Sequence, residues 1–176
     1  IGDKSLITNT ENFTHQNVNR NAIVLAVPKD IDTEIKIGDE VIVHHNVFRV
    51  WKDIRGVEQN SKSYFKDDQY FVQQDQMYLY KQNNQWKSID DYCFIKPIHS
   101  LNKLDIGNEQ PLIGVLKYTN NSKYLKKLNI GDLVGFTPRS EYEFIINGER
   151  LYRVLTKAIT IKYEYEGKEK EYNPSW

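Results

Sequence analysis

Residues 35–43 read IKIGDEVIV and residues 128–136 read LNIGDLVGF, so one short pattern occurs twice in this chain of 176 residues. In each copy an isoleucine precedes Gly-Asp, and a mostly apolar run follows. Glycine adopts a positive φ without strain, and aspartate accepts hydrogen bonds from nearby backbone N–H groups. The pattern therefore predicts a turn that leads into a β-strand, and its recurrence predicts a duplicated structural unit.

Further landmarks flank the two Gly-Asp pairs in the same order. Upstream, residues 23–25 align with residues 114–116, and the intervals to the glycine differ by two residues (38 minus 23 against 131 minus 114). Three landmarks in one order support duplication rather than chance. The downstream landmarks are residues 70–72 and 77–79 in the first copy, and residues 151–154 and 159–161 in the second.

The rest of the chain favours strands as well. It contains twelve Tyr, seven Phe and three Trp, and aromatic and β-branched side chains pack well on a pleated sheet. Asn147-Gly148 predicts a type I′ hairpin, because that turn needs a positive φ at both central residues. Helix is expected only at residues 121–128. The predicted strands are residues 22–27, 40–43, 47–51, 69–72, 77–80, 92–95, 113–118, 133–136, 142–146, 150–154 and 159–165.

The second copy resembles a subunit of the GroES-type co-chaperonins along its length. An opening strand that ends in Lys-Pro (residues 91–97) is followed by a polar segment, by residues 114–116, by the Gly-Asp landmark and by a closing strand at residues 159–161. This is the order found in that family. The first copy shows the same order from Ala22 onward, but an alanine stands where the family usually has a glycine, and its hairpin is longer.

The resemblance implies an all-β fold made of two tandem GroES-like small β-barrels with little helix. The first barrel would span residues 1–87 and carry an enlarged hairpin at residues 52–66. The second would span residues 88–176 and end in a charged C-terminal tail. Since no counterpart of the opening strand precedes Ile1, we expect the first barrel to lack this strand or to take it from another chain.

The resemblance also implies a function. Members of the family act through a loop between their first and second strands, and a short apolar plug in this loop inserts into a groove on a chaperonin ring. The equivalent loops would be residues 2–19 and residues 99–112. The first holds a contiguous apolar pair in a polar setting typical of a segment that orders on binding, whereas the apolar residues of the second are scattered. The plug candidates are Ser5, Leu6, Ile7 and Thr8 in the first loop, and Leu104 and Ile106 in the second.

By this resemblance, the chain would be a co-chaperonin that binds and caps an ATP-driven chaperonin ring to assist protein folding. It would bind no cofactor, because the ATP belongs to the partner, and it would have no enzymatic activity. We expect a homo-oligomer, since ring assembly pairs the exposed edge strands of neighbouring subunits.

Two other interpretations stay open. Leu6 and Ile7 would pack on their own domain if they are ordinary core residues. The chain would be a structural or assembly protein, from a viral particle for example, if the barrel serves as a building block. The enlarged hairpin, the scattered apolar residues of the second loop and the tail with Tyr172, Pro174 and Trp176 favour this alternative.

Composition excludes several classes of function. Lys and Arg together number 24, as do Asp and Glu, so the formal net charge is zero and the basic groove of a nucleic-acid binder is not expected. A single cysteine excludes an internal disulfide and favours a cytoplasmic location, which would be the host cytoplasm for a viral protein. No apolar run approaches the roughly 20 residues that a membrane-spanning helix needs. Aromatic residues that would stack on single-stranded nucleic acid, if they were exposed, are Tyr64, Phe65, Tyr70, Tyr78 and Tyr80.

No catalytic or metal-binding motif stands out. His44-His45 lies in a predicted strand region, where neighbouring side chains point to opposite faces and do not chelate one ion, so no metal is expected. Cys93 lies in an apolar strand pattern typical of an inert core thiol. The acidic pairs at residues 67–68 and 90–91 are typical of solvated turns. Phosphate-binding and nucleophile-elbow motifs are absent from the sequence, and we therefore predict that the chain is not an enzyme.

Overall fold

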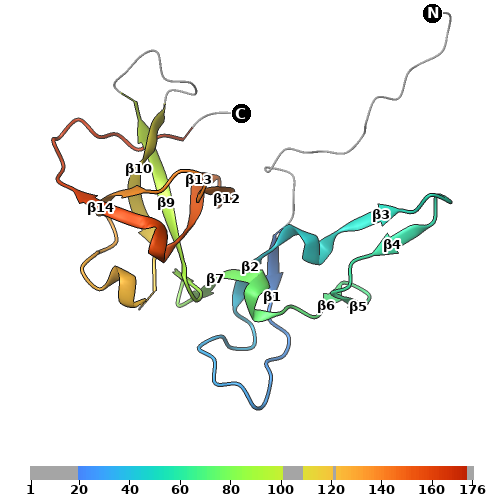
Figure 1. Ribbon diagram of the computed structural model, residues 1–176. Helices are drawn as coiled ribbons and strands as arrows, with labels where there is room; N and C mark the ends of the chain where they lie inside the picture. Colours follow the sequence, from blue (N-terminus) through green and yellow to red (C-terminus); the bar gives the residue numbers. More distant parts are fainter. Residues whose placement is uncertain (1–19, 101–108, 121, 174–176) are drawn as a thin grey trace, which may run out of the picture.

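The computed structural model describes residues 20–100, 109–120 and 122–173. These residues form an all-β structure whose only helical segments are short 3-10 turns, as the sequence predicts (Figure 1). No helix among them is long and apolar enough to cross a membrane.

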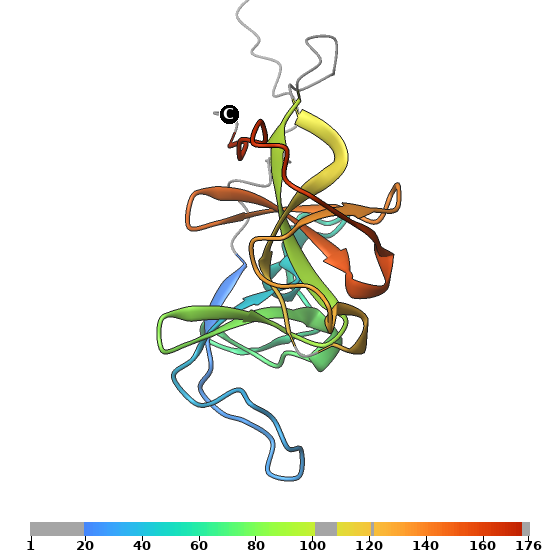
Figure 2. The same ribbon diagram turned by 90° about the vertical axis from the view of Figure 1, so that its left-hand side faces the viewer.

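Two larger antiparallel sheets carry the fold. The first has the order β1-β2-β7-β8 and the second has the order β12-β13-β9-β10-β11-β14. Figure 2 shows the connection between β1 and β2 extending from the body on the side away from the second sheet. The strands of the first sheet are β1 (Asn21–Ile23), β2 (Glu40–Val43), β7 (Met77–Gln82) and β8 (Gln85–Ser88). Those of the second are β9 (Tyr92–His99), β10 (Glu109–Tyr118), β11 (Leu133–Phe136), β12 (Tyr142–Ile146), β13 (Glu149–Leu155) and β14 (Ile159–Tyr163).

Neither sheet closes on itself within the described residues, since β1 does not pair with β8 and β12 does not pair with β14. Two small hairpins form an arm that projects from the body in Figure 1 and contains the predicted enlargement at residues 52–66. The arm consists of β3 (Val50–Lys52), β4 (Glu58–Asn60), β5 (Tyr64–Lys66) and β6 (Gln69–Tyr70).

The first Gly-Asp corner is held by three local hydrogen bonds. The Asp39 carboxylate accepts from the backbone N–H of Lys36 at 2.8 Å. The N–H of Gly38 donates to the carbonyl of Val24 at 2.8 Å, and the N–H of Val24 donates to the carbonyl of Asp39 at 2.9 Å. Gly38 has a φ of 92°, the left-handed region that glycine occupies most easily.

The second corner repeats these bonds. The Asp132 carboxylate accepts from the N–H of Asn129 at 2.8 Å. Gly131 donates to the carbonyl of Leu116 at 2.8 Å, and Leu116 donates to the carbonyl of Asp132 at 2.9 Å. The φ of Gly131 is 96°. The two Gly-Asp corners therefore share one local structure, for the physical reason that the sequence suggested.

The likeness continues along the strands that follow. The β2–β7 ladder has a register shift between Ile42 and Val43, and the β11–β14 ladder has one between Gly135 and Phe136. A 3-10 turn directly precedes the closing strand in each case, at Gln74–Gln76 and at Thr156–Ala158. The last carbonyl of each turn accepts a hydrogen bond from the residue that follows β2 or β11. The N–H of His44 donates to the carbonyl of Gln76 at 2.8 Å, and the N–H of Thr137 donates to the carbonyl of Ala158 at 3.0 Å.

Strand register corrects the upstream alignment by one residue. Ile23 lies opposite Glu40, and Val115 lies opposite Leu133, which occupies the same place after the second Gly-Asp pair. Ile23 therefore corresponds to Val115, and not to Gly114 as the sequence alignment had it. The sequence alignment matched residue types, whereas the pairing of backbone hydrogen bonds decides which residues are equivalent.

Replacing Gly131 with alanine is expected to lower the free energy of unfolding by about 1–2 kcal/mol, the usual cost of placing an L-residue in the left-handed region. Nothing lies within 4 Å of an added Cβ at this position or at Gly38, so the cost is conformational rather than steric. Urea unfolding should give a similar loss for Gly38→Ala and a smaller loss for Gly131→Asn, because asparagine tolerates this turn position. Equal losses for alanine and asparagine at residue 131 would contradict this explanation.

Other local predictions had mixed outcomes. The Asn147-Gly148 hairpin is confirmed, with φ values of 52° and 78° at its two central residues. The strand predicted at residues 47–51 is wrong in its first half, because His45–Phe48 forms a 3-10 turn. The imidazole of His44 caps that turn by accepting from the N–H of Asn46. The helix predicted at residues 121–128 shortens to the single 3-10 turn Lys123–Leu125.

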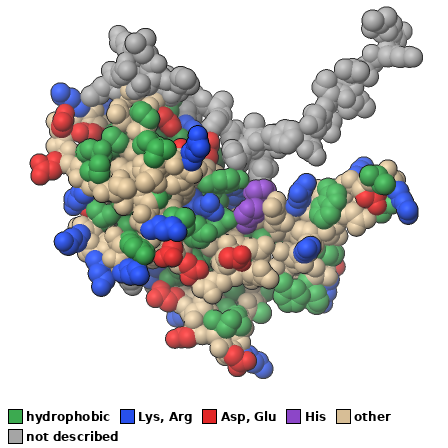
Figure 3. Space-filling model, viewed as in Figure 1, with side chains coloured by type: hydrophobic (Ala, Val, Ile, Leu, Met, Phe, Trp, Pro, Cys, Tyr) green, Lys and Arg blue, Asp and Glu red, His purple; other side chains and the backbone are tan. Residues whose placement is uncertain are grey.

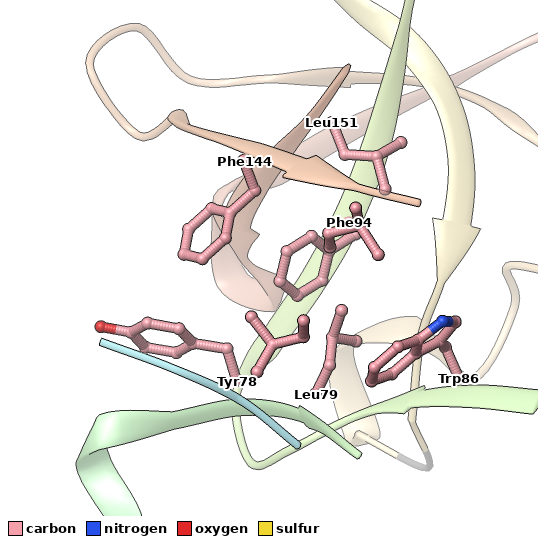
Figure 4. Close-up of a cluster of buried hydrophobic side chains, with 8 residues drawn as sticks. Tyr78, Leu79, Trp86, Phe94, Phe144 and Leu151 are labelled. Carbon is pink, nitrogen blue, oxygen red and sulfur yellow. The ribbon is translucent and has the colours of Figure 1, made fainter. Parts of the chain in front are cut away.

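A hydrophobic cluster joins the two larger sheets, and we call it the shared core (Figure 4). Its aromatic rings meet edge to face: the ring centroid of Phe144 lies 5.5 Å from that of Tyr78 and 5.6 Å from that of Phe94. Such contacts add to the stabilisation from burial. The first sheet contributes Ile42, Tyr78, Leu79 and Trp86, and the second contributes Phe94, Phe144, Ile146 and Leu151.

Candidate functional site

All six plug candidates, Ser5, Leu6, Ile7, Thr8, Leu104 and Ile106, lie outside the described residues. The structure does show where the two segments that contain them join the sheets. Residues 1–19 lead into β1, and residues 101–108 lead into β10. Because β1 and β10 are equivalent strands, the two segments precede the same element of the repeated structure.

The segment before β10 joins the structure at a partly buried ionic cluster. Glu109, the first residue of β10, pairs with Arg150 of β13 at 2.8 Å between carboxylate oxygen and Nη1. Arg150 also pairs with Glu143 of β12 at 3.2 Å. The hydroxyl of Tyr152 donates to Glu109, and burial together with this hydrogen bond raises the pKa of Tyr152. The tyrosine therefore stays a neutral donor.

The segment before β1 joins the same cluster. Arg20 is only 6% exposed, and its Nη1 donates to the backbone carbonyl of Glu143 at 3.2 Å. Its guanidinium lies over the ring of Phe144, 4.1 Å from the centroid, in a cation–π contact. Burial lowers the pKa of Arg20. Glu143 thus contacts both Arg20 and Arg150.

We call Arg20, Glu109, Glu143 and Arg150 the loop-root cluster. It brings the starts of β1 and β10 to one hairpin, β12–β13. Sequence reasoning did not find it, because Arg20 and Glu143 are 123 residues apart and neither belongs to a motif.

A second arginine links the sheets beside this cluster. The guanidinium of Arg153 lies 4.5 Å from the ring centroid of Tyr78 in the first sheet and 4.9 Å from that of Tyr92 in the second. Arg20, which precedes β1, and Arg153 of β13 thus link the two sheets through cation–π contacts with Phe144 and Tyr78.

The C-terminal tail packs on its own chain. Glu171 forms a bridge with Ile98 of β9, and the N–H of Tyr172 donates to the carbonyl of Pro97 at 2.8 Å. The rings of Tyr172 and His99 are 4.5 Å apart. The tail residues up to Asn173 thus contact β9 of their own chain, and docking of Tyr172 on a neighbour stays a prediction. Pro174 and Trp176 lie outside the described residues.

The histidine pair is not arranged as the sequence suggested. His44 and His45 belong to the 3-10 turn and its cap rather than to a strand, and their rings stack with centroids 4.4 Å apart. Burial lowers the pKa of His44, and the nearby Arg153 lowers it further. Within residues 20–100, 109–120 and 122–173, no three His, Cys, Asp or Glu side chains come together as metal ligands.

Cys93 is fully buried, and burial raises the pKa of its thiol to about 12. We expect no labelling by a thiol reagent at pH 8 in the folded protein and complete labelling in denaturant, because the thiolate is the reactive form. An Ile54→Cys variant is the matched control, since Ile54 is fully exposed at the tip of the arm. It should react at once under folding conditions. Equal labelling rates for the two thiols in the folded protein would contradict the burial of Cys93.

The aromatic candidates for base stacking do not form one surface. Tyr78 and Tyr80 are buried, whereas Tyr64 and Phe65 are exposed on the arm. Figure 3 shows acidic and basic side chains interspersed over the face it presents, without a continuous basic stripe. This arrangement gives no support to nucleic-acid binding.

An open cleft of 1220 Å³ is bordered by β8, β10 and the connection from β8 to β9. The acidic pair Asp90 and Asp91 borders it, and Asp90 accepts a hydrogen bond from Gln74. Trp86 and Ser88 also line this cleft, and both side chains carry a buried polar atom without a partner among the described residues. Neither β8 nor this cleft was predicted from the sequence.

The chain matches no protein-family model, and a search of curated proteins finds no match to it.

Proposed function

We propose that this protein is a co-chaperonin-like cap, built from two tandem GroES-like barrel units (residues 1–87 and 88–176), that binds an ATP-driven chaperonin ring and assists protein folding. The observation that carries the proposal is the loop-root cluster. Two segments that precede equivalent strands end at one hairpin, where Arg20 and Glu109 contact Glu143 and Arg150. Two candidate plug segments that end at one place suit a protein that engages a ring through both of them.

The repeated corners support the same proposal. A cap that presents two plug segments is expected to use the same local backbone structure twice. The matching hydrogen bonds of Asp39 and Asp132 supply such a design in each half of the chain. Both scaffolds keep the Gly-Asp landmark of the co-chaperonin resemblance. Assembly into a homo-oligomeric ring and a cytoplasmic location belong to this proposal.

The test is nucleotide-dependent binding to a chaperonin ring. A double variant, Leu6→Asp with Ile7→Asp, is expected to abolish co-sedimentation with the ring in the presence of ATP, because a charged plug does not enter an apolar groove. The matched control, Asn9→Asp with Thr10→Asp, adds the same charge outside the plug and should bind as the unaltered protein does. Absence of binding by the unaltered protein, with and without ATP, overturns the proposal.

A second candidate, a structural or assembly role, is favoured by the arm. Its exposed apolar side chains cover both hairpins, and Figure 3 shows hydrophobic patches on it. Contiguous exposed apolar surface marks protein–protein contacts. Recovery of the protein in purified particles at a fixed stoichiometry, which is lost on Ile54→Asp, would support this role; a free soluble ring would contradict it. The exposed residues of the arm are Val50, Trp51, Ile54, Val57, Tyr64, Phe65 and, just after β6, Phe71.

A further inference from the structure

Two hydrophobic clusters, one in each larger sheet, correspond at several positions. We call them the first-sheet cluster and the second-sheet cluster. Strand register matches Val41 and Val43 of β2 with Val134 and Phe136 of β11. It also matches Val24 with Leu116 at the Gly-Asp corners. The first-sheet cluster contains Ile35, Val41, Val43, Val47, Tyr80 and Ile89, with Ala22, Val24, Phe48, Tyr70, Val72 and Met77 packed against it. The second-sheet cluster contains Cys93, Ile95, Leu116, Leu125, Val134, Phe136, Val154 and Ala158, with Leu112, Leu128, Tyr152, Leu155 and Ile159 packed against it.

Residues 70–72 correspond to residues 152–154, because both stand at the same distance before the closing strand and its 3-10 turn. Tyr70 and Val72 therefore match Tyr152 and Val154. The contribution of β9 to the second-sheet cluster, Cys93 and Ile95, has no counterpart among the described residues of the first.

In the second sheet, β9 lies between β10 and β13, which correspond to β1 and to residues 70–72 of the first copy. Ile95 is opposite Leu116 of β10, and Cys93 is opposite Val154 of β13. In the first sheet the same position is open within the described residues. β1 pairs only with β2, so it is an edge strand, and β6 pairs only with β5.

The missing strand shows in the burial of the side chains it would cover. Leu116 and Val154 are fully buried, whereas their counterparts Val24 and Val72 are only partly buried. On the opposite face of the same strands, Val115 packs with Ile98 of β9 and is 5% exposed, whereas its counterpart Ile23 is 58% exposed. Apolar side chains of β1 are thus less covered on both faces than those of β10, which pairs with β9.

The backbone of β1 is also arranged to accept a strand. Val24 directs its N–H and its carbonyl towards the β2 side, where they bond to Asp39 and Gly38. Since hydrogen-bonding directions alternate along an antiparallel strand, the N–H and carbonyl of Ile23 point to the open edge. The counterpart Val115 uses that edge to pair with Lys96 of β9.

We propose that the open edge of β1, together with residues 70–72, is a binding site for one β-strand of a partner polypeptide. The strand adds antiparallel to β1 and carries two apolar side chains at positions i and i+2, which enter the first-sheet cluster as Cys93 and Ile95 enter the second. This is strand addition to an exposed sheet edge. It does not depend on the chaperonin proposal.

Residues 1–19 do not have the side-chain spacing that this strand needs. The large apolar residues among the first nineteen are Ile1, Leu6, Ile7, Phe13 and Val18, and no two of them are spaced i and i+2. The strands of a second copy with suitable spacing, such as β9, are already placed in their own sheet.

Ala22 limits how closely the strand approaches. It corresponds to Gly114, where an added Cβ would lie 2.4 Å from the carbonyl oxygen of Lys96. The added strand therefore keeps an ordinary separation from β1 and pairs first at Ile23, where the outward backbone groups are.

The test uses a synthetic peptide with the sequence of β9 and valine in place of Cys93 (YVFIKPIH). We expect it to bind the whole chain and to slow hydrogen exchange of the Ile23 amide, followed by NMR. A control peptide with aspartate at the two inward positions, 93 and 95, should bind at least about tenfold more weakly, since two apolar side chains no longer become buried. Equal affinity for the two peptides overturns the proposal.

Two variants of the chain locate the site. Ile23→Pro removes the outward N–H but keeps the β2 ladder, because proline is tolerated on an edge strand whose N–H faces away from the sheet. It should abolish peptide binding, with an unchanged unfolding midpoint showing that the sheet is intact. Ile23→Thr keeps the N–H and should bind as before.

Three results would overturn the proposal. The first is peptide binding to Ile23→Pro that equals binding to Ile23→Thr. The second is slowed exchange confined to β10 and β13, which would show that the peptide only displaces β9. The third is an Ile23 amide that is already protected from hydrogen exchange without peptide. Native mass spectrometry would then show whether a second copy (a dimer) or the chain's own residues (a monomer) cover the edge of β1.

Discussion

Phe94→Ala is expected to lower the free energy of unfolding by about 3–5 kcal/mol, the range for removing a fully buried phenylalanine ring. Phe94 is fully buried in β9, the strand between β10 and β13. Its ring meets Phe144 at 5.6 Å and Tyr118 at 6.3 Å between centroids. The side chains around the ring come from strands of both sheets, which limits how far they can move into the space that the ring leaves (Figure 4).

Equilibrium urea unfolding followed by tryptophan fluorescence gives the loss directly. Phe65→Ala is the matched control, because Phe65 is 52% exposed on the arm and belongs to none of the clusters. It should change the free energy of unfolding by no more than about 0.5 kcal/mol, as for other surface substitutions. Similar losses for the two variants would contradict the shared core as the main source of stability.

Gly114→Ala is expected to destabilise the protein by about 3 kcal/mol, at the upper end of the usual cost of overpacking. An added Cβ would lie 2.4 Å from the carbonyl oxygen of Lys96 and 2.5 Å from Cγ2 of Ile95. The nearest of these atoms belongs to the backbone of β9, which is held on its other side by β13. The strand has no low-energy way to move aside.

Gly135→Ala separates this steric effect from the general loss of a glycine. An added Cβ there would meet only the ring of Tyr163, at 2.9 Å. That side chain can rotate, so the loss should be less than half of that for Gly114→Ala. Thermal unfolding of both variants beside the unaltered protein is the measurement. A larger loss at Gly135 would show that backbone contact is not what requires glycine at residue 114.

Local signals in the sequence predicted local structure well. The strands at residues 40–43, 133–136 and 142–146 have the predicted bounds. Asn147-Gly148 and the two Gly-Asp pairs form the turns expected of them, because each motif determines its own backbone geometry. Residues 47 and 48 show the limit of such reasoning, since they belong to a 3-10 turn capped by His44 although residues 47–51 were predicted to form a strand.

Long-range features were not predictable in the same way. The contact of Arg20 with Glu143 depends on the docking of one sheet on the other, which no local pattern encodes. The residues predicted to contact a partner, Leu6 and Ile7 among them, lie outside the described residues, so that part of the site stays a prediction. Closed barrels were expected, but the hydrogen-bonded sheets have open edges within the described residues, and β1 is one of them.

The shared core has a consequence for how the polypeptide divides. Its rings come from residues on both sides of position 88, so each half produced alone would expose one side of the cluster to water. Cutting the peptide backbone between Asn83 and Asn84, at the exposed tip of the β7–β8 hairpin, should leave two pieces that stay associated after cleavage. We therefore expect cooperative folding to extend across residue 88, although a Gly-Asp corner lies on each side of it.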